Sequence, residues 1–144
     1  MDRQDVPAGP LAVDTDAFSF IHYVRGRHAE FAELIDGHPV ALPFPVVGEL
    51  KVLAIRARFG KPRRQALETA IAACVVIPAD ARVVDKWAEL HARFLGRLKD
   101  GGINDLWIAA CCLVHDLPLV TNNRSDFETI AGEFQDLRLV HPDL

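Results

Sequence analysis

The chain has 144 residues, of which half are hydrophobic and a quarter are charged, and its formal net charge is −4. These values exclude a disordered, collagen-like or coiled-coil chain, and the length fits one globular domain. An acidic chain is a poor match for a protein that only coats nucleic acid, because such binding relies on Lys and Arg to neutralise phosphates.

The expected location is the cytoplasm. No apolar run reaches the length of a membrane span, and the N-terminus lacks the basic start and apolar stretch of a signal peptide. The three cysteines, Cys74, Cys111 and Cys112, lie in apolar contexts. Their odd number argues against a disulfide framework and for a reducing compartment.

The first half of the chain predicts two strands and four helices. Residues 1–10 are polar and contain two prolines and a glycine, so we expect a loose lead-in. Asp16 is placed to cap the first helix, whose apolar face continues to Val24. In chain order, the predicted elements are a strand over 11–13, a helix after Asp16, a helix over 29–35, a strand over 40–42, and helices over 46–58 and 62–73.

The second half predicts three strands and three helices. Its clearest helix begins near Asp80, has apolar residues at helical spacing up to Leu98, and is ended by Gly101 and Gly102. Asn104 is a natural N-cap for the next helix. In chain order, the predicted elements are a strand over 75–78, the helix just described, a helix from 104 or 105 to 115, a strand over 118–121, a helix over 125–131, and a strand over 137–140.

Short, uniformly apolar strands that alternate with helices are typical of a parallel sheet covered on both faces. The sequence therefore predicts a single three-layer α/β/α domain with a mostly parallel sheet. In such a sheet, ligands bind beyond the carboxyl ends of the strands.

Acidic and amide side chains from four segments are predicted to meet at that edge. They are Asp14 and Asp16 after the first strand, Glu49 in the first turn of the helix over 46–58, Asp105 at the start of a later helix, and Asn123 and Asp126 after the strand over 118–121. Each one alone has a structural explanation, as a helix cap or a solvent-facing side chain. Only the combination points to chemistry.

Clustered carboxylates repel one another unless a divalent cation neutralises them. Mg²⁺ and Mn²⁺ prefer oxygen ligands and keep several waters, so a few carboxylates suffice. A metal-bound water is a strong nucleophile, and the metal stabilises charge on phosphate oxygens. The arrangement therefore suits hydrolysis of phosphodiester bonds.

At this point the sequence resembles a known family, the PIN-domain nucleases, and within it the VapC-like toxins. The resemblance runs from residue 11 to about residue 140. Four segments carry it: LAVDTD at 11–16, PVVGEL at 45–50, INDLWIAA at 103–110, and LVTNNRSDF at 119–127. It implies a PIN-like α/β/α fold and a ribonuclease that depends on Mg²⁺ or Mn²⁺. It also implies a homodimer and neutralisation by a cognate antitoxin protein.

The resemblance assigns Asp14, Glu49 and Asp105 to the metal-binding carboxylates. Many relatives have an aspartate eighteen residues after the second one, and Asn123 stands there in this chain. Asp126 and Asp16 are the other candidates for this fourth position, which leaves one or two metals open. Thr121 is expected to orient a carboxylate or a water through its hydroxyl.

A basic cluster surrounds the turn at Gly60. It consists of Arg56, Arg58, Lys61, Arg63 and Arg64. It fits contacts with RNA phosphates, and equally an ordinary solvated helix end. Arg25 and Arg27, after the first helix, raise the same question.

Two other functions fit part of the pattern. Asp14-Thr-Asp16 after a strand resembles the start of haloacid-dehalogenase-like phosphatases, in which Asp14 would be the nucleophile. That chemistry wants a later Lys and an Asp-Asp pair, which the sequence does not offer convincingly, and it leaves Glu49 without a role. Alternatively, the chain is an inactive PIN-like binding module, with Asn123 as the first sign of decay.

Overall fold

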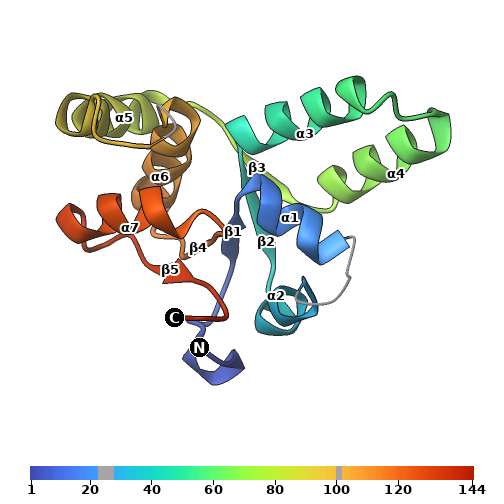
Figure 1. Ribbon diagram of the computed structural model, residues 1–144, viewed down its shortest axis with the longest axis horizontal. Helices are drawn as coiled ribbons and strands as arrows, with labels where there is room; N and C mark the ends of the chain where they lie inside the picture. Colours follow the sequence, from blue (N-terminus) through green and yellow to red (C-terminus); the bar gives the residue numbers. More distant parts are fainter. Residues whose placement is uncertain (23–27, 100–101) are drawn as a thin grey trace.

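The computed structural model describes residues 1–22, 28–99 and 102–144. Within these ranges, five strands form one sheet, and the chain also forms seven α-helices and one short 3-10 helix (Figure 1). None of the helices in the described ranges is long and apolar enough to cross a membrane. The predictions made for Val24, Arg25, Arg27 and Gly101 lie outside the described residues.

The sheet is parallel, as the sequence predicted, and its strand order is β3-β2-β1-β4-β5. The central strand β1 pairs on one side with β2 and on the other with β4, so that Ala12 lies between Ala41 and Leu119. Every residue of β1 is buried. The strands are β1 (Leu11–Val13), β2 (Val40–Pro43), β3 (Val75–Ile77), β4 (Leu119–Val120) and β5 (Leu139–Val140).

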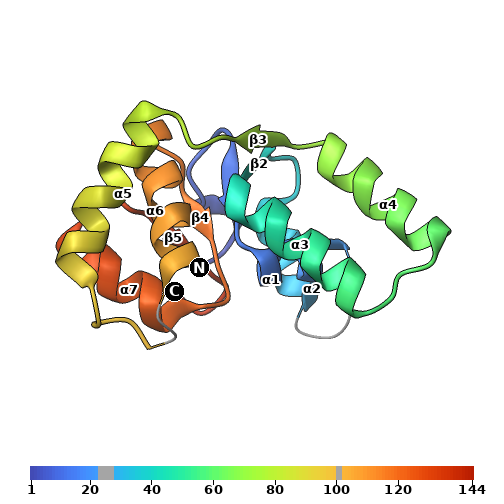
Figure 2. The ribbon, with the colours of Figure 1, turned by 90° about the horizontal axis from the view of Figure 1, so that it is seen from above.

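The helices form two layers, one on each side of the sheet (Figure 2). The connections from β1 to β2 and from β2 to β3 run in one direction along the sheet, and the later connections run in the other. Because parallel crossovers are right-handed, this reversal places the first four helices on one face and the last three on the other. The helices are α1 (Thr15–His22), α2 (His28–Ile35), α3 (Phe44–Arg56), α4 (Lys61–Ala72), α5 (Ala81–Phe94), α6 (Ile103–His115) and α7 (Arg124–Glu133).

Several helix boundaries differ from the prediction, and backbone conformation explains two of them. Helix α3 ends at Arg56 rather than at residue 58, because Arg58 adopts a left-handed φ of 53°. Helix α5 ends at Phe94 rather than at Leu98, and Gly96 then turns the chain with a φ of 74°. Left-handed residues cannot continue a right-handed helix.

Two predicted caps are also wrong. Asp16 lies inside the first turn of α1, and Asp14 caps that helix by accepting a hydrogen bond from the Ala17 amide at 2.8 Å. Helix α6 begins after Gly102, so its N-cap is neither Asn104 nor Asp105. The side chain of Asn104 is thereby free to make a contact elsewhere.

The N-terminal segment is not the loose lead-in that its composition predicted. Residues Arg3–Asp5 form a 3-10 helix, called η1, closed by a capping box between Asp2 and Asp5. Arg3 pairs with Asp36 at 3.6 Å, and the Met1 amino group donates to the Pro142 carbonyl at 3.2 Å. These contacts join residues that are far apart in the sequence, so local composition carries no information about them.

Candidate active site

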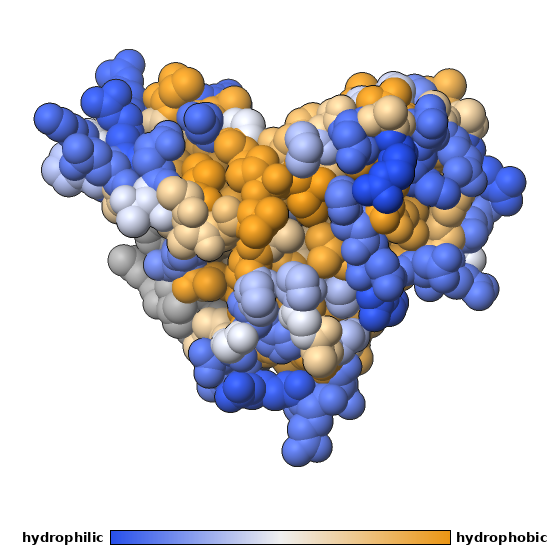
Figure 3. Space-filling view, turned by 180° about the vertical axis from the view of Figure 1, so that it is seen from behind, coloured by the Kyte–Doolittle hydropathy of each residue, from blue (hydrophilic) through white to orange (hydrophobic). Residues whose placement is uncertain are grey.

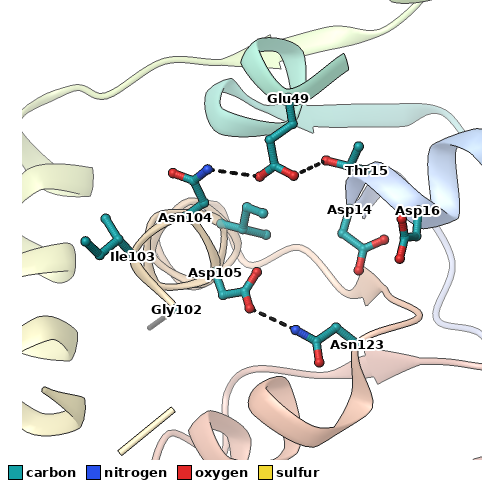
Figure 4. Close-up of a pocket in the computed structure, with 10 residues that line it drawn as sticks. Asp14, Thr15, Asp16, Glu49, Gly102, Ile103, Asn104, Asp105 and Asn123 are labelled. Carbon is teal, nitrogen blue, oxygen red and sulfur yellow. Dashed lines mark hydrogen bonds between the residues drawn. The ribbon is translucent and has the colours of Figure 1, made fainter. Parts of the chain in front are cut away.

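The site lies where the chain changes direction in the sheet. Strands β1 and β4 are neighbours, but their following helices, α1 and α7, go to opposite faces. Such a switch point leaves a crevice beyond the carboxyl ends of the two strands. A cavity of about 590 Å³ is found there, and its walls include Asp14, Asp16, Glu49, Asp105 and Asn123 (Figure 4).

Asp14 is the most rigidly held carboxylate of the site. It directly follows β1 and is only 6 % exposed. One oxygen, Oδ1, accepts the Ala17 amide of α1. The other, Oδ2, accepts the Thr121 hydroxyl at 2.5 Å and the Asn122 amide at 3.3 Å. Asp14 thus connects the ends of β1 and β4.

Asp105 enters the cavity from the first turn of α6, opposite Asp14 (Figure 4). Its Oδ2 accepts a hydrogen bond from the amide nitrogen Nδ2 of Asn123 at 2.9 Å. Asn123 is itself fixed, because its backbone amide donates to the Thr121 hydroxyl at 2.9 Å. The amide that stands at the predicted fourth position therefore orients a neighbouring carboxylate.

Glu49 approaches from α3, and both of its carboxylate oxygens have donors. Oε2 accepts the Thr15 hydroxyl at 2.9 Å, and Oε1 accepts Nδ2 of Asn104 at 3.2 Å (Figure 4). Thr15 and Asn104 are site residues that the sequence pattern did not predict. The available signal was their position, because each stands next to a predicted ligand, Asp14 or Asp105.

The electrostatics of the cavity are unfavourable for ionised carboxylates. Burial raises the pKa of Asp14 to about 6, although its hydrogen bonds oppose the shift. Burial, followed by the charges of Asp126, Asp14 and Glu49, raises the pKa of Asp105 to about 7. Among the described residues that line the cavity there is no Lys, Arg or His to offset this charge.

The other predicted residues lie at different depths. Asp16 is exposed on the rim, and Thr121 is fully buried beneath Asp14. Asp126 is 2 % exposed and is not among the residues that line the cavity.

The basic cluster lies at the α3–α4 turn, away from the carboxylates, and all five of its residues are exposed. A second hollow of about 750 Å³ shares Thr15, Asp16, Glu49 and Asn104 with the first and extends along α3 to Arg56. Arg56 is thus the one member of the cluster that lines a hollow adjoining the site, among those that the structure describes. The others project from the turn and from α4.

Comparison with known proteins agrees with this geometry. The PIN domain family matches residues 11–133. Ribonuclease VapC5 from Mycobacterium tuberculosis is 31 % identical over 125 residues, a stretch that covers 85 % of this chain and 90 % of the relative.

Two solved structures have the same fold over nearly the whole chain. One is VapBC-5 from Mycobacterium tuberculosis, a member of the VapBC family of toxin–antitoxin systems, with a TM-score of 0.68 and 29 % identity over 94 % of this chain and 99 % of that one. The other is VapBC-1 from nontypeable Haemophilus influenzae, with a TM-score of 0.73 and 19 % identity over the same shares. With its parallel sheet, its carboxylate-lined switch point and these relatives, the chain belongs to the PIN domain family.

Proposed function

We propose that this protein is a divalent-metal-dependent endoribonuclease and the toxin of a toxin–antitoxin pair. One observation carries the proposal: four carboxylates, from Asp14, Asp16, Glu49 and Asp105, line one cavity whose described walls hold no positive side chain. Burial raises the pKa of Asp14, and burial together with the neighbouring carboxylates raises the pKa of Asp105. The kinship with Ribonuclease VapC5 supports RNA as the substrate.

The donor set fits Mg²⁺ or Mn²⁺, since Asp14, Glu49 and Asp105 offer only hard oxygen ligands. Within the described residues, no three acidic, His or Cys side chains already lie together as a metal-binding group. Glu49 instead accepts hydrogen bonds from the neutral side chains of Thr15 and Asn104, and Asp105 accepts one from Asn123. When bound, the ion would activate water and stabilise charge on the phosphate oxygens.

The chain's own residues would orient these ligands. Asp14 is fixed by three donors, so it needs no rearrangement to present the same oxygens each time. Asn123 donates a hydrogen bond to Asp105. Of the three candidates for the fourth position, Asn123 and Asp16 line the cavity, and Asp126 does not. Thr121 would act indirectly, through its hydrogen bond to Asp14.

The decisive experiment is incubation of the purified protein with total bacterial RNA in Mg²⁺, in Mn²⁺ and in EDTA. We expect discrete fragments in the presence of metal and none in EDTA. Intact RNA in all three, from a folded and antitoxin-free protein, would favour the inactive binding module. The phosphatase alternative has less support, because none of the described residues that line the cavity is a lysine.

Asn104→Ala tests whether the amide orients Glu49 as a ligand. Loss of the 3.2 Å hydrogen bond frees one carboxylate oxygen. We expect Mn²⁺ affinity, measured by isothermal titration calorimetry, to fall by about tenfold, at the low end of the range for residues that support metal ligands. Asn122→Ala is the matched control, because Asn122 contacts Asp14 through its backbone amide. Unchanged Mn²⁺ affinity in Asn104→Ala would refute the orienting role.

The basic cluster is the proposed contact for RNA phosphates. Substituting Lys61, Arg63 and Arg64 together by Ser should weaken RNA binding on the order of tenfold at low salt and reduce the salt slope by about 0.7 per lost contact. Filter binding in an Asp14→Asn background avoids cleavage. Arg82→Ser on α5, also exposed, is the control. Equal slopes for the triple variant and its parent would assign the cluster to an ordinary solvated turn.

The partners we propose are a second copy of the chain and an antitoxin protein. Helix α3 exposes Val52, Leu53 and Ile55, with Ile55 at 75 %. Apolar side chains also gather in the middle of the face shown in Figure 3, between mostly polar ends. Apolar surface of this kind marks contacts with other proteins. The solved VapBC structures are toxin–antitoxin systems, which supports an antitoxin here, and the cytoplasm as the site of action fits both partners.

A further inference from the structure

Asp126 is a buried acid that lies outside the wall of the cavity. It stands in the first turn of α7 and is 2 % exposed. Its Oδ1 accepts the backbone amide of Lys99 at 3.0 Å, across 27 positions of sequence. Its Oδ2 is also buried and has no hydrogen-bond partner among the described residues. A buried polar atom without a hydrogen-bond partner calls for a structural or functional explanation.

The Lys99 amide belongs to the connection between α5 and α6, which leads to the active site. Leu98 in the same connection is buried and packs against Gly102, the N-cap of α6. The contact is close, because a Cβ at Gly102 would lie 2.4 Å from Cδ1 of Leu98. Gly102 also has a left-handed φ of 59°. The start of α6 thus packs against Leu98, the neighbour of the residue whose amide Asp126 accepts.

Two side chains at the start of α7 make contacts near the start of α6. Asn123 reaches directly to the Asp105 carboxylate, whereas Asp126 reaches to Lys99, on the chain that enters α6. Asp105 lies three residues after Gly102, in the first turn of the same helix. Any shift of this helix start would move Asp105 relative to Asp14, whose own position is fixed by β1 and β4.

We propose that Asp126 is a positioning residue, whose carboxylate anchors Lys99 beside Leu98, the residue against which Gly102 packs, and so places Asp105 opposite Asp14. The inference rests on the proposed metal-dependent function, because it assigns Asp126 a part in building that site. This positioning role requires a hydrogen-bond acceptor at residue 126, and it does not require that Asp126 bind the metal. The negative charge also lies near Asp105, whose pKa it helps to raise.

The test compares Asp126→Asn with Asp126→Ala. The asparagine keeps an oxygen that accepts the Lys99 amide, whereas the alanine removes it. We expect Asp126→Ala to speed hydrogen exchange at the Lys99 amide by about tenfold or more and to lower Mn²⁺ affinity by about tenfold. Asp126→Asn should stay within about threefold of the parent in both, as expected when the acceptor is retained. Asp126→Leu, similar in volume, replaces the alanine if that variant does not fold.

Asp136→Ala is the matched control, because Asp136 is an exposed aspartate beyond α7. The proposal is overturned if Asp126→Asn loses as much Mn²⁺ affinity as Asp126→Ala while hydrogen exchange at the Lys99 amide of Asp126→Asn is unchanged. The negative charge, and not the acceptor, would then be what matters. It is equally overturned if Asp126→Ala leaves exchange at Lys99 unchanged. If the parent itself binds no Mn²⁺, the proposed function fails, and exchange at Lys99 still decides whether Asp126 is the anchor.

Discussion

Replacing Asp14 by Asn is expected to lower metal-dependent RNA cleavage on the order of 100-fold or more, the scale seen when one charged group is removed from a catalytic site. The variant keeps the size of the side chain but loses the negative charge at the centre of the proposed metal site. It also cannot accept all three hydrogen bonds that now fix Asp14, from Ala17, Thr121 and Asn122. Initial rates on a defined RNA in Mn²⁺ measure the effect.

Asp136→Asn is the control for this experiment, since it removes the charge of an exposed aspartate outside the cavity. The circular dichroism spectra of both variants must match that of the parent. A loss of cleavage then reflects the catalytic step and not a loss of folding. Cleavage by Asp14→Asn at a tenth of the parental rate or faster would remove Asp14 from the metal site and, with it, the central part of the proposed function.

The sequence predicted the fold and the meeting of the carboxylates because both follow from regular rules. Short apolar strands that alternate with helices form parallel sheets, and residues after such strands share an edge. Asp14, Glu49 and Asp105 line one cavity in the structure. Their roles as metal ligands stay a prediction until the metal is tested.

What the sequence could not supply are contacts between distant residues. The local context of Asn104 favours a helix cap. In the structure Gly102 takes that place, and Asn104 reaches Glu49 across 55 positions of sequence. Local propensity carries no information about such a partner.

Asp126 shows the same limit in another form. The family spacing puts Asn123 at the fourth position, and Asp126, three residues later, is a further candidate. Their side chains in fact go to different places, Asn123 to the Asp105 carboxylate and Asp126 to the Lys99 amide. Which of two neighbouring polar residues faces a cavity depends on how the start of α7 packs against the rest of the fold, and the local sequence does not specify that packing.

The metal-free protein is expected to lose stability as pH rises from about 4 to 8, and Mn²⁺ should restore it. The folded state raises the pKa of Asp14 from 3.8 to about 6 and that of Asp105 from 3.8 to about 7. Between these values the folded chain binds more protons than the unfolded chain, so the free energy of unfolding falls with increasing pH.

Asp14→Asn isolates one part of this effect, because an amide does not titrate. In EDTA, the free energy of unfolding of the parent relative to the variant should drop by about 2.4 kcal/mol between pH 4 and pH 8, because the unfolded carboxyl is already more than half ionised at pH 4. Glu133, whose pKa is lowered by Arg97 and Arg93, changes stability in the opposite sense, but equally in both proteins. Urea denaturation across this pH range gives both curves.

Mn²⁺ is expected to restore the stability that is lost at high pH. At pH 8, an ion at 100 times its dissociation constant should stabilise the parent by about 2.7 kcal/mol and should stabilise Asp14→Asn much less. Parallel pH curves for the two proteins in EDTA would show that burial does not disfavour the Asp14 charge. Equal stabilisation by Mn²⁺ would place the ion away from Asp14. Only a site that is destabilised by its own carboxylates, and relieved by a cation that needs Asp14, gives both results together.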